Sequence, residues 1–210
     1  FHYDTLRDYY QKWYRPDLQG IIVVGDIDVD QIEAKIRKLF SDNPMPIGAP
    51  QRTYYTVPDN KEMIVYTQAD NEQPTLNFSL YMKHDAEQRQ SRATREAFLS
   101  SYKSRLAMFI LRQRLAQLSH EAHPRVMSAN CRVGNFYVTT EKDAFALNIG
   151  LMPNNPQVGI DAAIEIVEKA RRYGFTAAEL EHAKVQHTVS IEHRLDNKNK
   201  TRNAEYAKNI

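Results

Sequence analysis

The fold is decided in residues 6–40, whose sequence is LRDYYQKWYRPDLQGIIVVGDIDVDQIEAKIRKLF. Its first part predicts a helix with one apolar face, because large apolar residues recur at three- and four-residue spacing: Leu6, Tyr9, Tyr10 and Trp13. Pro16 ends this helix, since the residue before a proline is pushed out of the α region. We expect Trp13, the only tryptophan, to be buried against the strand that follows.

Residues 20–25 predict that strand. Four β-branched residues follow one another there without polar alternation, which is typical of a strand buried on both faces. A second helix then begins at Asp28, with Gln31 three residues on, the spacing of a capping box. Its apolar positions repeat with helical spacing: Val29, Ile32, Ile36, Leu39 and Phe40. The segment is therefore a complete helix–strand–helix unit.

The remaining chain alternates groups of strands with helices. Residues 43–58 hold four prolines and predict a surface loop. Residues 62–69 and 76–82 predict a hairpin. Residues 91–118 predict a long core helix. The arginines of 89–95 are interpreted as its solvated first turn and the residues leading into it. Three further strands are predicted at 125–132, 135–140 and 144–151. An amphipathic helix then ends at Gly174, and its apolar face consists of Ile160, Ala163, Ile164, Val167 and Ala170.

The last helix has its own start signal. Gly174 is expected to stop the preceding helix in the left-handed αL conformation, and Thr176 with Glu179 forms a second capping box. Leu180, Ala183, His187, Ile191 and Leu195 lie on one face of this last helix. The order of elements predicts an α+β fold, one domain over residues 1–210, with an antiparallel sheet of about six strands packed on one side by helices.

Composition excludes several classes of protein. The chain has 210 residues, 42% hydrophobic and 26% charged, which is the ordinary globular balance. Its net charge of +2 lacks the basic excess of a nucleic-acid binder. No apolar run approaches the ~18 residues that span a bilayer. Because the chain starts at Phe1 and stops at Ile210 inside a stretch that predicts helix, we expect it to be a fragment of a longer protein.

Two motifs carry a resemblance to a known family. The first is the aromatic-rich helix followed by YRPD at 14–17 and VVGDID at 23–28; the second is YGFTAAEL at 173–180 with Ala183 and Lys184. Both resemble, in the same order, the carboxy-terminal, non-zinc-binding domain of one half of a pitrilysin/insulinase-type zinc metallopeptidase, an inverzincin. The resemblance covers nearly the whole chain and implies the fold of mitochondrial-processing-peptidase-like metallohydrolases.

The zinc motif of that family, H-x-x-E-H on a helix, is absent from the chain. The histidines of His120-Glu121-Ala122-His123 are three apart and Pro124 follows at once, so this string is interpreted as a polar helix end. The spacing of His187, Glu192 and His193 is too long for one helical face. We therefore expect no catalytic residue and no metal or other cofactor in the chain; the resemblance implies that zinc belongs to a missing preceding domain.

Two arginines are weak candidates for substrate binding. In many relatives the long helix ends in an arginine, followed by an aromatic-led strand that touches substrate. Arg112 and Arg114 occupy the helix here, but no tyrosine follows before Arg125. A structural role near a helix C-terminus, where cations are favoured, is an equal alternative. Cys131, the single cysteine, is interpreted as a buried structural thiol.

The resemblance implies a function for the parent protein. It would be a zinc metalloendopeptidase that degrades or processes unfolded peptides, and this chain would be a non-catalytic domain that shapes the enclosing chamber. Its partners would be other domains of the same protein and the peptide substrate, with no nucleic acid and no membrane-spanning segment; the bacterial cell envelope or periplasm is the expected location. Two alternatives stay open: a scaffold or interaction domain of a catalytically inactive family member, or a self-contained binding module that shares only the fold.

Overall fold

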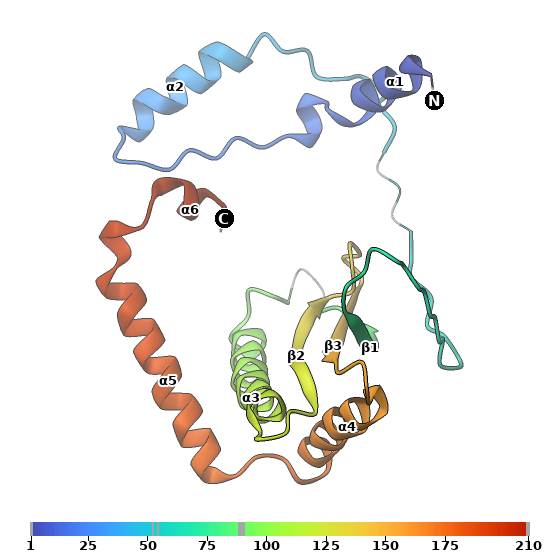
Figure 1. Ribbon diagram of the computed structural model, residues 1–210. Coiled ribbons are helices and arrows are strands. Elements are labelled where there is room, and N and C mark those ends of the chain that lie inside the picture. Colours follow the sequence, from blue (N-terminus) through green and yellow to red (C-terminus); the bar gives the residue numbers. More distant parts are fainter. Residues whose placement is uncertain (1, 52, 54, 88–90, 209–210) are drawn as a thin grey trace. The chain divides into compact units, whose positions relative to one another are not determined.

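The computed structural model describes residues 2–51, 53, 55–87 and 91–208, and it divides into two compact units (Figure 1). One unit comprises Phe1–Tyr54 with His193–Ile210, and the other comprises Tyr55–Glu192. Parts of the predictions for the proline-rich loop 43–58, for 89–95 and for the two ends of the chain lie outside the described residues. Each unit is described by itself.

The first unit contains α1 (Tyr3–Trp13), η1 (Pro16–Leu18), α2 (Val29–Phe40), η2 (Lys198–Lys200) and α6 (Asn203–Lys208). The predicted cap of α2 is confirmed: an Asp28 carboxylate oxygen accepts a hydrogen bond from the Gln31 backbone N–H at 3.0 Å. The Gln31 side-chain amide donates to the other carboxylate oxygen, also at 3.0 Å. The Gln31 side chain thus binds the side chain of Asp28 instead of reaching back to its backbone.

The predicted strand over 20–25 is wrong for the described chain. These residues connect η1 to α2 without strand pairing, and Ile21 and Ile22 are about half exposed. A strand needs a neighbour for its backbone hydrogen bonds, and no described strand lies in this unit. Trp13 is accordingly only partly buried, with the Lys12 ammonium 5.1 Å from its ring centre, so the expected packing of Trp13 against a strand is also wrong.

The second unit is built on an antiparallel sheet in the order β1-β3-β2, from β1 (Leu76–Asp85), β2 (Val126–Asn135) and β3 (Lys142–Leu151). Leu80 and Cys131 both lie opposite Leu147 in the central strand. The sheet of the described residues has three strands, which corrects the prediction of about six. The α+β class itself is confirmed.

The predictions of strands over 62–69 and 135–140 are also wrong, for separate reasons. Residues 62–69 form no ladder, and their apolar members Met63 to Tyr66 are more than 70% exposed, so no packed layer rewards pairing. Residues 136–141 form the connection between β2 and β3, where Tyr137 has a φ of +53°. That left-handed conformation interrupts an extended strand.

Two helices, α3 (Arg95–His120) and α4 (Pro156–Tyr173), cover one face of the sheet, and α5 (Ala177–Asp196) follows them (Figure 1). The core between sheet and helices consists of Leu111, Leu115, Leu118, Val126, Cys131, Leu147, Ile149, Leu151, Ala162 and Ala163. Gly159 lets α4 pack closely against the backbone at the start of β2, because a Cβ at this position would lie 2.8 Å from the Arg125 carbonyl oxygen. Gly174 ends α4 as predicted, but with φ +71° and ψ −146° it is not in the αL conformation.

Candidate functional site

Arg114, one of the two candidate arginines, lies at the centre of a polar cluster. Its side chain extends from α3 to the connection between α4 and α5. Its Nε donates to Glu179 at 2.6 Å and its Nη2 donates to the other carboxylate oxygen at 2.8 Å. Nη2 also donates to the Gly174 carbonyl at 3.3 Å, and the guanidinium lies 5.0 Å from the Phe175 ring centre. This bidentate geometry is specific to arginine, since lysine offers only a point charge.

The other side of the cluster is the predicted capping box, which is confirmed. The backbone N–H and the hydroxyl of Thr176 donate to the Glu179 carboxylate at 2.7 and 2.8 Å, and the Thr176 hydroxyl oxygen accepts from the Glu179 N–H at 3.3 Å. These donors, Arg114 first, lower the pKa of Glu179 to about 2. We name the residues Arg114, Gly174, Phe175, Thr176 and Glu179 the Arg114 cluster. Its charges are paired within the fold, so it joins α3 to α5.

Arg112 has a different environment. Its side chain is exposed, and its Nε donates to the Met108 carbonyl within the same helix at 3.1 Å. Residues two apart on a helix do not face each other. The structure therefore does not bring Arg112 and Arg114 into one site: the Arg114 guanidinium is bound to Glu179, whereas Arg112 lies at the surface.

The candidate metal ligands lie apart. Within the described part of the chain, no group of three or more His, Cys, Asp or Glu side chains could hold a metal ion. The helix α3 ends at His120, and the Glu121 carboxylate accepts two hydrogen bonds from Arg125, which lower its pKa. The His187 ring lies edge-on to the Tyr102 ring at 5.1 Å, and His193 lies 3.1 Å from the Asn197 amide.

Cys131 is a buried thiol of the core, as expected. It is 1% exposed, and burial raises its pKa to about 11. The thiolate is the reactive form of cysteine, so this thiol is poorly suited to act as a nucleophile at neutral pH. Its role is to fill the space between β2 and the α3–α4 layer.

Two buried cations were not found from the sequence. Arg15, 8% exposed, donates to the Pro50 carbonyl and to the Asp17 carboxylate, both at 3.1 Å. Lys142, equally buried, donates to Asp59 at 2.8 Å and to Asp85 at 2.6 Å. The available signals were the position of Arg15 within YRPD and the position of Lys142 at the start of an apolar strand. Both cations anchor loops to neighbouring elements, and neither leaves a free charge for chemistry.

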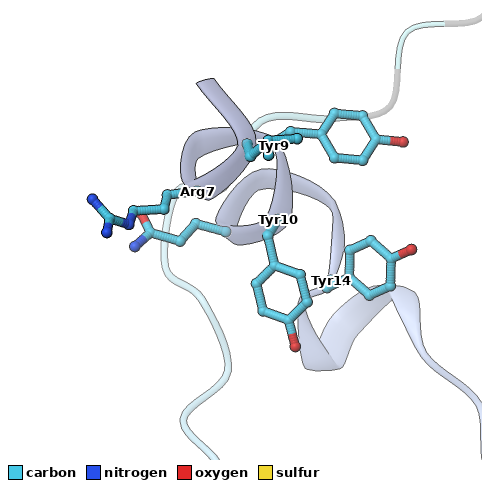
Figure 2. Close-up of a pocket in the computed structure, with 6 residues that line it drawn as sticks. Arg7, Tyr9, Tyr10 and Tyr14 are labelled. Atoms are coloured by element: carbon cyan, nitrogen blue, oxygen red, sulfur yellow. The ribbon is translucent and has the colours of Figure 1, made fainter. Parts of the chain in front are cut away.

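The described residues of the first unit form an apolar groove. It follows α1, has a volume of about 580 Å³ and is lined by Leu6, Arg7, Tyr9, Tyr10, Gln11 and Tyr14 (Figure 2). The rings of Tyr10 and Tyr14 stack with centres 4.8 Å apart and an angle of 11° between their planes. The spacing of apolar residues predicted a helical face with Leu6, Tyr9 and Tyr10, and these three side chains are each more than half exposed.

The sequence matches one protein family. The family described as "Peptidase M16 inactive domain" matches residues 1–186. The chain is 26% identical over 182 residues to "Probable zinc protease PqqL" of Haemophilus influenzae. This alignment covers 83% of this chain and 18% of that protein. It is 22% identical over 191 residues to the protein of the same name from Escherichia coli K12. This alignment covers 91% of this chain and 20% of that protein. The chain thus spans about a fifth of these relatives.

Solved structures share the fold. The crystal structure of the periplasmic protease PqqL from Escherichia coli aligns with a TM-score of 0.74 at 19% identity, over 99% of this chain and 22% of that one. The crystal structure of the first half of the same protease aligns with a TM-score of 0.75 at 20% identity, over 98% of this chain and 43% of that half. At this identity the structural likeness shows the fold alone.

Proposed function

This chain belongs to the peptidase M16 inactive-domain family, and from that membership we propose that it is a non-catalytic, substrate-enclosing domain of a zinc metalloendopeptidase. The observation that carries the proposal is the family match over residues 1–186, which includes both sequence motifs. The relatives named zinc proteases extend the proposal to the parent protein. Zinc and its general base would then belong to another domain of that parent.

The side chains of this chain support a structural part in the enzyme. A metallopeptidase hydrolyses its substrate with a metal-activated water. The partly buried Arg114 is instead paired with Glu179, and the buried Lys142 is paired with the exposed carboxylates of Asp59 and Asp85. Such pairs hold helices and loops in place.

The expected partners follow from the same proposal. They are the other domains of the parent protein and an unfolded peptide. No described helix is both long and apolar enough to cross a membrane. Since the Escherichia coli relative PqqL is a periplasmic protease, we propose the bacterial periplasm as the location.

Photo-cross-linking tests the enclosing role. A peptide carrying a photoreactive group would be bound to the full-length protein in the presence of a chelator, which prevents its cleavage, and cross-linked sites would be mapped by mass spectrometry. Cross-links within residues 55–192, reduced by excess unlabelled peptide, are the expected result. Cross-links confined to positions of the full-length protein outside residues 1–210 would refute the enclosing role of this chain.

The scaffold alternative is decided by the parent sequence. An H-x-x-E-H motif in the preceding part of the parent would favour the peptidase. A degenerate motif, together with full-length protein that binds no zinc, would favour a scaffold or interaction domain of an inactive family member.

A further inference from the structure

The second unit holds a concave apolar site at one end of its sheet. The site has a volume of about 500 Å³, and its walls come from four segments of the chain. They are residues 74–75 before β1, residues 119 and 124 at the end of α3, residues 126–127 at the start of β2 and residues 152–153 after β3. We name this site the Met127 pocket. A volume of roughly 300–1,000 Å³ is typical of ligand sites in proteins.

A β-bulge places Met127 in the wall of the Met127 pocket. The register of β2 against β3 shifts between Val126 and Ser128, so Met127 is the extra residue of the bulge. Bulges on edge strands redirect a side chain. Gly150 in β3 leaves room for this one, because a Cβ there would lie 2.8 Å from the Ser128 hydroxyl oxygen and 3.5 Å from the Met127 Cβ.

The walls of the Met127 pocket are fixed before any ligand enters. The Arg125 N–H donates to the Leu118 carbonyl at 3.2 Å and closes the loop after α3. The Asn155 N–H donates to the Met152 carbonyl, also at 3.2 Å, and closes the turn after β3. Three of the four wall segments contain a proline, which has a fixed φ: Pro74, Pro124 and Pro153. Binding to such walls therefore costs little ordering of the protein.

The lining of the Met127 pocket selects an uncharged, apolar ligand. None of the described residues that line it has an ionisable side chain. Its two hydroxyl groups are engaged: Ser119 donates to the Ala116 carbonyl at 2.8 Å, and the Thr75 oxygen accepts from two side-chain amides at 3.1 Å. The thioethers of Met127 and Met152 make favourable contacts with aromatic rings. An aromatic side chain is therefore the ligand that this lining fits.

We propose that the Met127 pocket binds an aromatic side chain of the peptide substrate. The proposal rests on the proposed function and deepens it, because it names the part of this chain that touches the peptide and the type of residue that it selects. Met127 is 53% exposed, so the pocket is open to a side chain that enters from an extended peptide.

Binding of two matched peptides to the full-length protein tests the proposal. Both peptides are fluorescent and unstructured, and they differ at one central position, which is phenylalanine in one and alanine in the other. A chelator prevents cleavage, and fluorescence anisotropy measures each Kd. We expect the phenylalanine peptide to bind at least about tenfold more tightly, because its ring is removed from water. Equal affinities would overturn the proposal, as they would if another domain of the parent fills the pocket.

A matched pair of variants assigns this preference to the Met127 pocket. Met127→Asp should abolish the preference and leave the affinity for the alanine peptide unchanged, because burying a carboxylate beside the ring is unfavourable. Met63→Asp makes the same change at a methionine of the same unit that is 78% exposed, and it should leave the preference intact. A preference that survives Met127→Asp would contradict the proposal.

Cross-linking locates the ring in the unaltered full-length protein. A benzophenone derivative of phenylalanine takes the central position of the peptide, and mass spectrometry maps the cross-links. Cross-links to Met127 or Met152, reduced by excess phenylalanine peptide, are the expected result. Cross-links found only elsewhere within residues 1–210 would overturn the pocket and leave the enclosing role standing. If neither peptide binds the full-length protein, both the pocket and the enclosing role are refuted.

Discussion

Arg114 on α3 donates two hydrogen bonds, of 2.6 and 2.8 Å, to the carboxylate of Glu179 in the first turn of α5. The two residues are 65 positions apart, and the same carboxylate closes the capping box with Thr176. One acidic side chain thus both caps a helix and binds that helix to another. This double role supports a structural part for Arg114 in the fold, while its role in substrate binding stays a prediction.

Removing the guanidinium should destabilise the fold. Arg114→Ala should lower the free energy of unfolding by about 1–3 kcal/mol, because the Glu179 carboxylate loses its charged partner while staying partly buried. Denaturant unfolding measures the change. Arg112→Ala is the control and should cost about 0.5 kcal/mol or less, since Arg112 lies at the surface. Equal losses from both variants would contradict the assignment.

Part of the loss of folding stability at low pH should come from protonation of the Glu179 carboxylate. The folded-state pKa of Glu179, about 2, lies below its ordinary value of 4.5. The carboxylate therefore contributes stability that is fully present above the ordinary value and is lost as the pH falls from about 4.5 towards 2. Denaturant unfolding at pH 5 and at pH 3 measures this loss. The unfolding free energy of Glu179→Gln should decline less between these two pH values than that of the unaltered chain. An identical decline would show that other groups account for it.

The core between sheet and helices should be sensitive to cavities. Leu147 is fully buried in the central strand. Leu147→Ala should cost about 2–5 kcal/mol of unfolding free energy, the range for truncating a buried leucine. Val138→Ala, at a fully exposed position of the connection between β2 and β3, is the control and should be nearly neutral. A loss below about 1 kcal/mol at Leu147 would mean that this core is loosely packed.

The isolated chain should hold no stoichiometric zinc. Its histidines are dispersed: His120 lies at the end of α3, while His187 packs against Tyr102 in α3 from its position on α5. Metal analysis after extensive dialysis measures the bound zinc. One tightly held zinc per chain would contradict the expectation, and substitutions of His187 and His120 would then identify the ligands.

Local signals in the sequence were sufficient for the elements that the chain stabilises by itself. The caps at Asp28 and Thr176 depend on residues three positions apart, so the sequence specifies them completely. The strands of the second unit and the helices α3, α4 and α5 were likewise predicted, to within a few residues at their ends. Their apolar faces meet one another inside the same unit.

Pairings between distant segments could not be predicted in this way. Residues 20–25 have the composition of a buried strand, but whether a strand forms depends on a partner, and the described unit offers none. The bidentate pair of Arg114 and Glu179 joins two helices across 65 residues, a relation that no local pattern contains. The sequence offered a helix-end role for Arg114 but not the identity of its anion.

Cleavage of a fluorogenic, unstructured peptide tests the central claim most directly. The isolated chain and the full-length protein would be assayed side by side, each with and without a metal chelator. The account predicts chelator-sensitive cleavage by the full-length protein and none by the isolated chain, because the proposed function assigns zinc and its activated water to another domain of the parent. Chelator-sensitive turnover by the isolated chain would contradict it.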